Sequence, residues 1–209
     1  IPAEGIFVDT YFDVSLNDSN VVSESKVIRA TSYFFSSGIV DGRLMIVNYD
    51  SFGGRGLSAV AITQNGFYVG DVGLHEMGHH FASLADEYEI KVYQRERPTS
   101  SDGRPNWSPT YALKTLPWKV WVEDGTPLPT PETEEYKAIA GAFEGANDWP
   151  TDVYRPYLDC KMRNSNQPFC NVCVEAHIMN FIQKVQLAVS ISPPRTAPVV
   201  LGSQEQEFK

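Results

Sequence analysis

The segment His75-Glu76-Met77-Gly78-His79 limits what this chain can fold into more than any other stretch. Two histidines four positions apart lie on one face of a helix, with Cβ atoms about 6 Å apart, so both imidazoles can reach one metal ion. An HExxH pattern on a helix typically binds zinc, and its glutamate lies next to a metal-bound water molecule. We therefore expect Zn²⁺ as the cofactor, His75 and His79 as ligands and Glu76 as the general base.

The composition restricts the partners of the chain. Its 209 residues, 42% of them hydrophobic, suffice for one sizeable core. A formal net charge of −9 argues against a nucleic-acid or anionic-membrane partner. No apolar run approaches the length of about 18 residues that a membrane span needs. No signal peptide precedes Ile1, and we interpret the N-terminus as trimmed or incomplete.

Hydrophobic periodicity predicts an α+β fold in a single catalytic domain, residues 1–209. Strands are expected at 5–12, 43–49 and 58–63, a glycine-rich loop at 51–57, and helices at 19–36, 71–84, 133–141 and 172–189, with Asp71 as the N-cap of the second helix. This order is typical of a metzincin-like zincin. An upper lobe (about 1–84) would hold a twisted mixed sheet and the active-site helix. A loop-rich lower lobe (about 85–190) would end in a helix, before a tail at 191–209.

A catalytic zinc usually has three protein ligands and one water molecule, so a third ligand is needed. If the helix continued past His79, Asp86 would be about 16 Å from His75, beyond reach of the same ion. Asp86 can bind only if the helix ends near Ser83 and the chain turns back, although no glycine is present there. We favour Asp86, then Glu87, then Glu96. His80 and His177 are expected to be packed or surface residues.

Three cysteines, Cys160, Cys170 and Cys173, fall within fourteen residues. One disulfide and one buried thiol is the simplest interpretation for a secreted protein. Cys170 and Cys173 also have the CxxC spacing of zinc ligands. The sequence has no second CxxC pair, which makes a cysteine zinc site the less favoured alternative.

The segment HEMGHHFASLADEY, residues 75–88, resembles the active-site region of the IgA-peptidase family of zinc metalloendopeptidases, a metzincin-like group. The resemblance covers roughly residues 5–185 and continues as short motifs in one order: VNYDSFGGRG at 47–56, PNW at 105–107, PWKVW at 117–121, TPLPTP at 126–131, FEGA at 143–146, YRP at 154–156, CKMR at 160–163 and FCNVC at 169–173. It implies a secreted or surface zinc endopeptidase, without implying immunoglobulin A as the substrate. It also implies that Met162 packs beneath the zinc in a tight turn.

The predicted reaction is hydrolysis of peptide bonds in a protein substrate by a monomeric enzyme. We expect an extended substrate to pair with the strand at 58–63. Tyr154 is a candidate hydrogen-bond donor to the developing oxyanion. One rival is a non-catalytic zinc-binding or adhesion module on the same fold, against which the intact Glu76 argues. The other is a gluzincin-type aminopeptidase, which would need a helical glutamate ligand and an anchor for the substrate amine.

Overall fold

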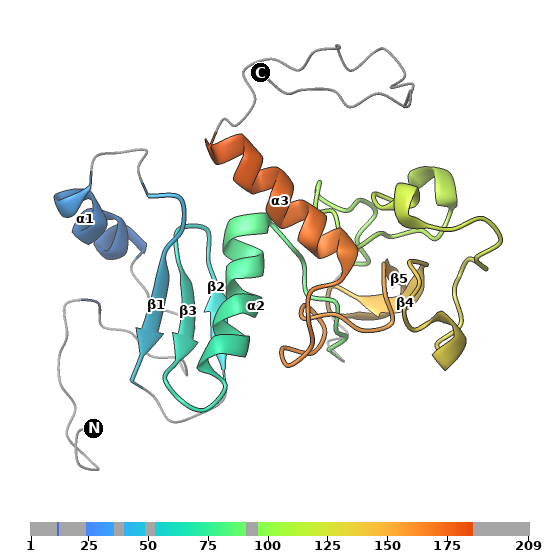
Figure 1. The fold of residues 1–209 in the computed structure, drawn as a ribbon, viewed down its shortest axis with the longest axis horizontal. Coiled ribbons are helices and arrows are strands. Elements are labelled where there is room, and N and C mark those ends of the chain that lie inside the picture. The colour runs from blue at the N-terminus through green and yellow to red at the C-terminus, as the bar shows by residue number, and fades with distance from the viewer. Residues whose placement is uncertain (1–11, 13–23, 36–39, 49–52, 91–95, 186–209) are drawn as a thin grey trace, which may run out of the picture.

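The computed structural model describes residues 12, 24–35, 40–48, 53–90 and 96–185, which form a mixed α+β fold (Figure 1). The α+β class predicted from the sequence is therefore confirmed, whereas the metzincin-like arrangement stays a prediction. Three α-helices, α1 (Glu24–Phe34), α2 (Val69–Ala82) and α3 (Asn171–Val185), accompany two small sheets. The strand expected at 5–12 falls almost wholly outside the described residues, and the tail at 191–209 does so completely. Among the described residues, no helix is long and apolar enough to cross a membrane.

The first sheet has the strand order β1-β3-β2. The strand β3 (Ala61–Gln64) is fully buried, and it pairs in parallel with β1 (Leu44–Val47) and antiparallel with β2 (Gly54–Gly56). The strands predicted at 43–49 and 58–63 match β1 and β3. The glycine-rich segment predicted as a loop instead contains β2, because pairing with β3 fixes these residues in the sheet although they carry no alternating hydrophobic pattern.

The helix α2 packs against β3 and β2 and also contacts α3, so it lies between the sheet and the part of the chain that follows it (Figure 1). It begins at Val69, two residues before Asp71. Asp71 was predicted to be the N-cap, but it lies inside the first turn of α2. Its carboxylate forms an ion pair with Lys161, with Oδ1 and Nζ 3.0 Å apart, which explains why it does not cap the helix.

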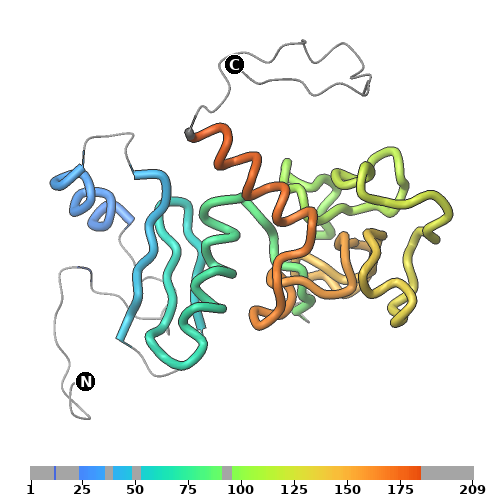
Figure 2. The backbone as a smooth tube through the Cα atoms, viewed as in Figure 1, coloured from blue at the N-terminus to red at the C-terminus, as the bar shows by residue number. Residues whose placement is uncertain are grey.

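The part of the chain after α2 is mostly irregular until α3 begins (Figure 2). Its second sheet is an antiparallel hairpin of β4 (Phe143–Ala146) and β5 (Trp149–Arg155). The helix predicted at 133–141 is only a 3₁₀ turn, Glu134–Tyr136, because the chain leaves the helical path and the Gly141 N–H donates to the Pro156 carbonyl over 2.8 Å. The 3₁₀ turns Leu113–Thr115 and Lys119–Trp121 precede it.

The largest buried cluster fills this second half. It contains Trp118, Leu84, Met162 and the three cysteines. A separate small core lies under α1 and the first sheet, around Val60 and Ile62. The two cores lie on either side of α2, whose buried residues include His75 and Glu76.

Candidate active site

The helix α2 ends at Ala82, close to where the sequence analysis required it to end. Ser83 takes up the left-handed conformation with φ 54°, although it is not glycine. The N–H of Leu84 then donates to the carbonyl of Gly78 over 3.1 Å, which closes the helix end. The chain therefore reverses and runs back past the histidines instead of continuing away from them.

This reversal brings the two histidines and Asp86 to a common point. Asp86 Oδ1 lies 3.0 Å from His75 Nε2 and 3.1 Å from His79 Nε2, and the two Nε2 atoms are 3.2 Å apart. In a tetrahedral zinc site with bonds of about 2.0–2.2 Å, neighbouring N and O ligands are about 3.3–3.5 Å apart. The three donors therefore fit one zinc ion. Neither Glu87 nor Glu96 belongs to this group.

Backbone carbonyls orient both imidazoles. His75 Nδ1 lies 2.9 Å from the Lys161 carbonyl, and His79 Nδ1 lies 2.8 Å from the Leu84 carbonyl. A carbonyl only accepts hydrogen bonds, so both Nδ1 atoms are donors and each Nε2 can offer a lone pair to a metal. Burial alone would raise the pKa of Asp86, but the proximity of the two histidines holds the pKa well below its usual value.

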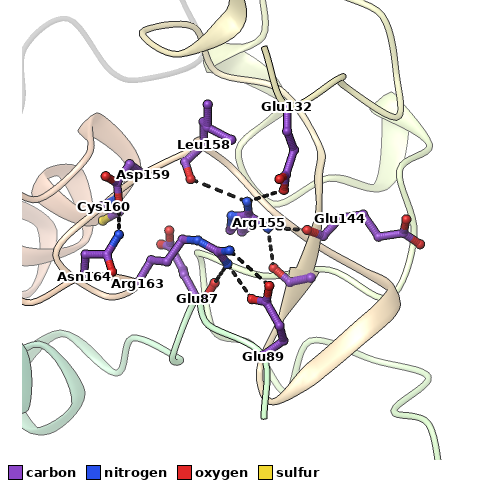
Figure 3. Close-up of polar contacts among 11 residues, drawn as sticks. Glu87, Glu89, Glu132, Glu144, Arg155, Leu158, Asp159, Cys160, Arg163 and Asn164 are labelled. Atoms are coloured by element: carbon purple, nitrogen blue, oxygen red, sulfur yellow. Dashed lines mark hydrogen bonds and ion pairs between the residues drawn. The ribbon is translucent and has the colours of Figure 1, made fainter. Parts of the chain in front are cut away.

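Two further side chains fix the segment that carries Asp86. The buried Asn106 amide bonds both the N–H and the C=O of Ala85, each over 2.8 Å. Arg163 donates to the Glu87 carbonyl over 2.9 Å and to the Glu89 carboxylate over 2.6 Å (Figure 3). The sequence analysis assigned no role to Asn106 or Arg163. Their only signal was their position in the PNW and CKMR motifs.

Met162 lies in a tight turn that packs against α2. The N–H groups of Arg163 and Asn164 both donate to the Cys160 carbonyl, and Met162, which lies within this turn, is completely buried. A Cβ atom added at Gly78 would be only 2.7 Å from the Met162 sulfur, so this glycine permits the close approach. The placement is compatible with a packing role beneath a metal, which stays a prediction.

Glu76 lies beside two clefts that share His75 in their linings. One cleft, of about 490 Å³, runs along β2 and past Ser83, and the other, of about 430 Å³, runs towards Arg163. His75, Glu76 and Tyr88 line both. Burial raises the pKa of Glu76, as expected for a carboxylate that has lost much of its hydration.

Strand β3 cannot receive a substrate. It pairs with β1 on one edge and with β2 on the other, and it is buried throughout. The predicted pairing of a substrate with residues 58–63 is therefore wrong. The strand that borders the cleft is β2, which is one of the two outer strands of the sheet in the described part of the chain.

Tyr88, rather than Tyr154, lies against the predicted metal ligands. Its ring stacks on His75 with centroids 6.3 Å apart, and its hydroxyl is hydrogen-bonded to Asp86. Tyr154 is 5% exposed, packs edge-on against Tyr111 and lines neither of the two clefts. The structure therefore does not bring Tyr154 to the group formed by the predicted ligands.

The two remaining histidines are packed, as expected. His80 lies between backbone groups of Leu57 and Arg43, each 3.2 Å away. His177 on α3 packs against the rings of Phe81 and Phe169. Neither is among the residues that converge with Asp86.

A helix with an HExxH motif, whose two histidines lie close to one aspartate, is typical of metallopeptidases. The chain matches the model of the IgA Peptidase M64 family over residues 5–140 and 132–182, and it belongs to this family. No match was found among curated proteins. The resemblance to the IgA-peptidase family, which the short motifs indicated, is thus confirmed.

Proposed function

We propose that this protein is a zinc-dependent endopeptidase in which His75, His79 and Asp86 hold the metal ion. The convergence of two Nε2 atoms and one carboxylate oxygen within 3.0–3.2 Å carries the proposal. Two neutral imidazoles and a carboxylate are a donor set that zinc accepts, and they leave its fourth position for water. When bound, the zinc would act as a Lewis acid towards that water and the scissile carbonyl.

Glu76 is the proposed general base. Its carboxylate takes a proton from a water molecule as the water attacks the carbonyl carbon, and then delivers this proton to the nitrogen of the leaving amine. Its burial suits both steps, because a raised pKa brings a carboxylate closer to the basicity that proton transfer near neutral pH requires. Tyr88 positions Asp86 through its hydroxyl group. Tyr154 has no part in this mechanism.

The clefts on both sides of Glu76 favour an endopeptidase over an aminopeptidase. A chain passing from one cleft to the other would extend beyond the scissile bond in both directions. We place an extended substrate along β2, where main-chain hydrogen bonds to this outer strand would provide affinity. Such bonds do not require a particular amino-acid sequence in the substrate. The glycines of β2 leave room beside the catalytic helix: a Cβ at Gly54 would be 2.6 Å from a Glu76 oxygen.

The test measures zinc content and casein hydrolysis on the same samples of the wild type, Glu76→Gln and Asp86→Ala. Glu76→Gln is expected to keep its zinc at the histidines and to lose about 10²-fold to 10⁴-fold in kcat, because only the proton acceptor is removed. Asp86→Ala is expected to lose activity together with the zinc of this site. Asp124→Ala, at an exposed position, serves as the control and should keep both.

Three results would contradict the proposal. Full activity in Glu76→Gln would remove this residue as the base. A wild type that binds zinc at the histidines but cleaves no protein would favour the non-catalytic binding module. Unchanged zinc and activity in Asp86→Ala would mean that Asp86 is not a ligand.

A further inference from the structure

A second group of metal-ligating side chains lies outside the proposed catalytic site. Glu87, Cys160, Cys170 and Cys173 are all buried, and one ligand atom from each lies within 4.8 Å of those from the other three. The three cysteines are free thiols in this structure. They reach the group from the turn before Met162 and from the beginning of α3, while Glu87 directly follows Asp86 in the chain.

The spacing of these atoms matches a metal site better than a disulfide. The sulfur atoms of Cys160 and Cys173 are 3.7 Å apart, and the Cys173 sulfur is 3.3 Å from Glu87 Oε1. A tetrahedral zinc ion with Zn–S bonds of about 2.3 Å and a Zn–O bond of about 2.0 Å separates its ligand atoms by about 3.5–3.8 Å. A disulfide would require about 2.05 Å between the sulfur atoms.

The carboxylate of Glu87 supplies an independent reason to expect a cation. This side chain is completely buried, and its Oε2 has no hydrogen-bond partner in the part of the chain that the structure describes. The Asn106 amide satisfies only Oε1, over 2.9 Å. A buried carboxylate oxygen without a partner is costly, and buried charges are normally paired or bound to metals.

We propose that Glu87, Cys160, Cys170 and Cys173 bind a second zinc ion, in a structural site separate from the catalytic one. Thiolate-rich, four-ligand sites select zinc, and a closed, buried set without an open position is typical of structural sites. The ion would join three segments: the irregular segment that carries Asp86, the turn that carries Met162 and the start of α3. It would thereby hold the surroundings of the catalytic site in place.

The site can be examined without the catalytic one by using the double variant His75→Ala/His79→Ala. We expect about one zinc per chain to remain in this variant, and we expect Co²⁺ substitution to produce the charge-transfer absorption of thiolate ligands. A metal-free double variant that retains its fold would overturn the proposal. So would a disulfide between any two of the cysteines, detected by mass spectrometry of the non-reduced protein. Because the catalytic ligands are absent from this variant, neither result depends on the proposed peptidase function.

Ligand variants made in the same background test the assignment. Cys173→Ser and Glu87→Gln should lower zinc affinity by about tenfold or more, since even the loss of a group that only supports a ligand has such an effect. His177→Gln is the matched control on α3, because its Nε2 is also buried without a partner but is not in the cluster. Loss of zinc in His177→Gln but not in Glu87→Gln would overturn the ligand set.

A third measurement uses the unaltered protein and covers the case in which the variants do not fold. The three thiols should resist alkylation under native conditions and react after a zinc chelator has removed the ion, with release of zinc in proportion. Thiols that stay unreactive while all zinc is removed, or that react fully while all zinc is retained, would contradict ligation.

Discussion

Ser83 determines where α2 ends and therefore whether Asp86 can reach the histidines. Its φ of 54° lies in the left-handed region, where a side chain is crowded against the backbone. Most helices that end this way have glycine at this position. The chain thus accepts local strain at the turn that assembles the site.

Replacing Ser83 with glycine should relieve this strain. We expect Ser83→Gly to raise the free energy of unfolding by about 1 kcal/mol, because glycine adopts positive φ without steric cost. For a chain of this size, this corresponds to a rise in Tm of about 2–4 °C, measured by thermal denaturation. Ser100→Gly, in an exposed loop without positive φ, is the control and should bring no gain. An equal rise in both variants would show that Ser83 is not strained.

At this scale the sequence predicts the side chains that converge at one point better than the residues that hold them there. His75 and His79 follow from the helical period alone, and Asp86 follows once the helix has to end. The partners of Glu87 could not be predicted in this way. Its carboxylate meets Asn106, 19 residues away, and Cys173, 86 residues away, and no local pattern connects them. Such contacts depend on how the irregular half of the chain folds.

Among the elements, α2 has three glycines, and two of them, Gly70 and Gly78, lie in very different surroundings. Gly78 is buried, and a Cβ there would lie 2.7 Å from the sulfur of Met162 and 3.3 Å from Leu84. Gly70 is exposed, and a Cβ there would meet nothing within 4 Å. One glycine is thus required by packing against Met162, whereas the other only weakens the helix.

These glycines should respond to alanine in opposite directions. Gly70→Ala should stabilise the protein by about 0.5–1 kcal/mol through helix propensity. Gly78→Ala should destabilise it by about 1 kcal/mol or more, because overpacking outweighs the same gain in propensity, and it should also weaken zinc binding at the histidines. Urea denaturation of both variants measures the difference. Stabilisation by Gly78→Ala would show that Met162 does not press against α2.

The elements that the sequence predicted well have a clear hydrophobic period. The strands β1 and β3 and the helices α2 and α3 all belong to this group. The strand β2 was not predicted because it has only three residues, two of them glycine, and its conformation comes from pairing with β3. Consequently the order of the strands, and with it the strand that borders the cleft, could not be predicted from the sequence.

In the whole molecule, the turn around Met162 is tied to two distant segments by charge. Lys161 pairs with Asp71 at the start of α2, and Arg163 pairs with Glu89, three residues after Asp86. The carboxylate of Glu89 accepts hydrogen bonds from Arg163, which hold its pKa below the usual value of 4.5. The two pairs connect the irregular half to α2 and to the segment that carries Asp86.

The pair of Glu89 and Arg163 should make stability depend on pH. Because the pKa of Glu89 is lower in the folded state, its contribution is fully present above about pH 4.5 and is lost as the pH falls through the folded value. Glu89→Gln should therefore be less stable at pH 7, by about 0.5–1 kcal/mol given the partial exposure of the pair, and the deficit should disappear in acid. Denaturation of both proteins across this range measures it. Glu134→Gln, from an exposed pair with Lys137, should show little deficit, and a deficit in Glu89→Gln that persists in acid would contradict the assignment.

Asp86 and Glu87 are neighbours in the chain, yet their carboxylates point to different groups, one to the histidines and the other to the thiols. Evolution can therefore vary the identity of residues in this stretch more easily than its length. Deleting one residue between Ser83 and Asp86 would shift Glu87 towards the histidines and Tyr88 towards the cysteines. One deletion would therefore disrupt both groups of side chains. In descendants of this gene, we expect the number of residues between His79 and Glu87 to stay constant even where the surrounding loops grow or shrink.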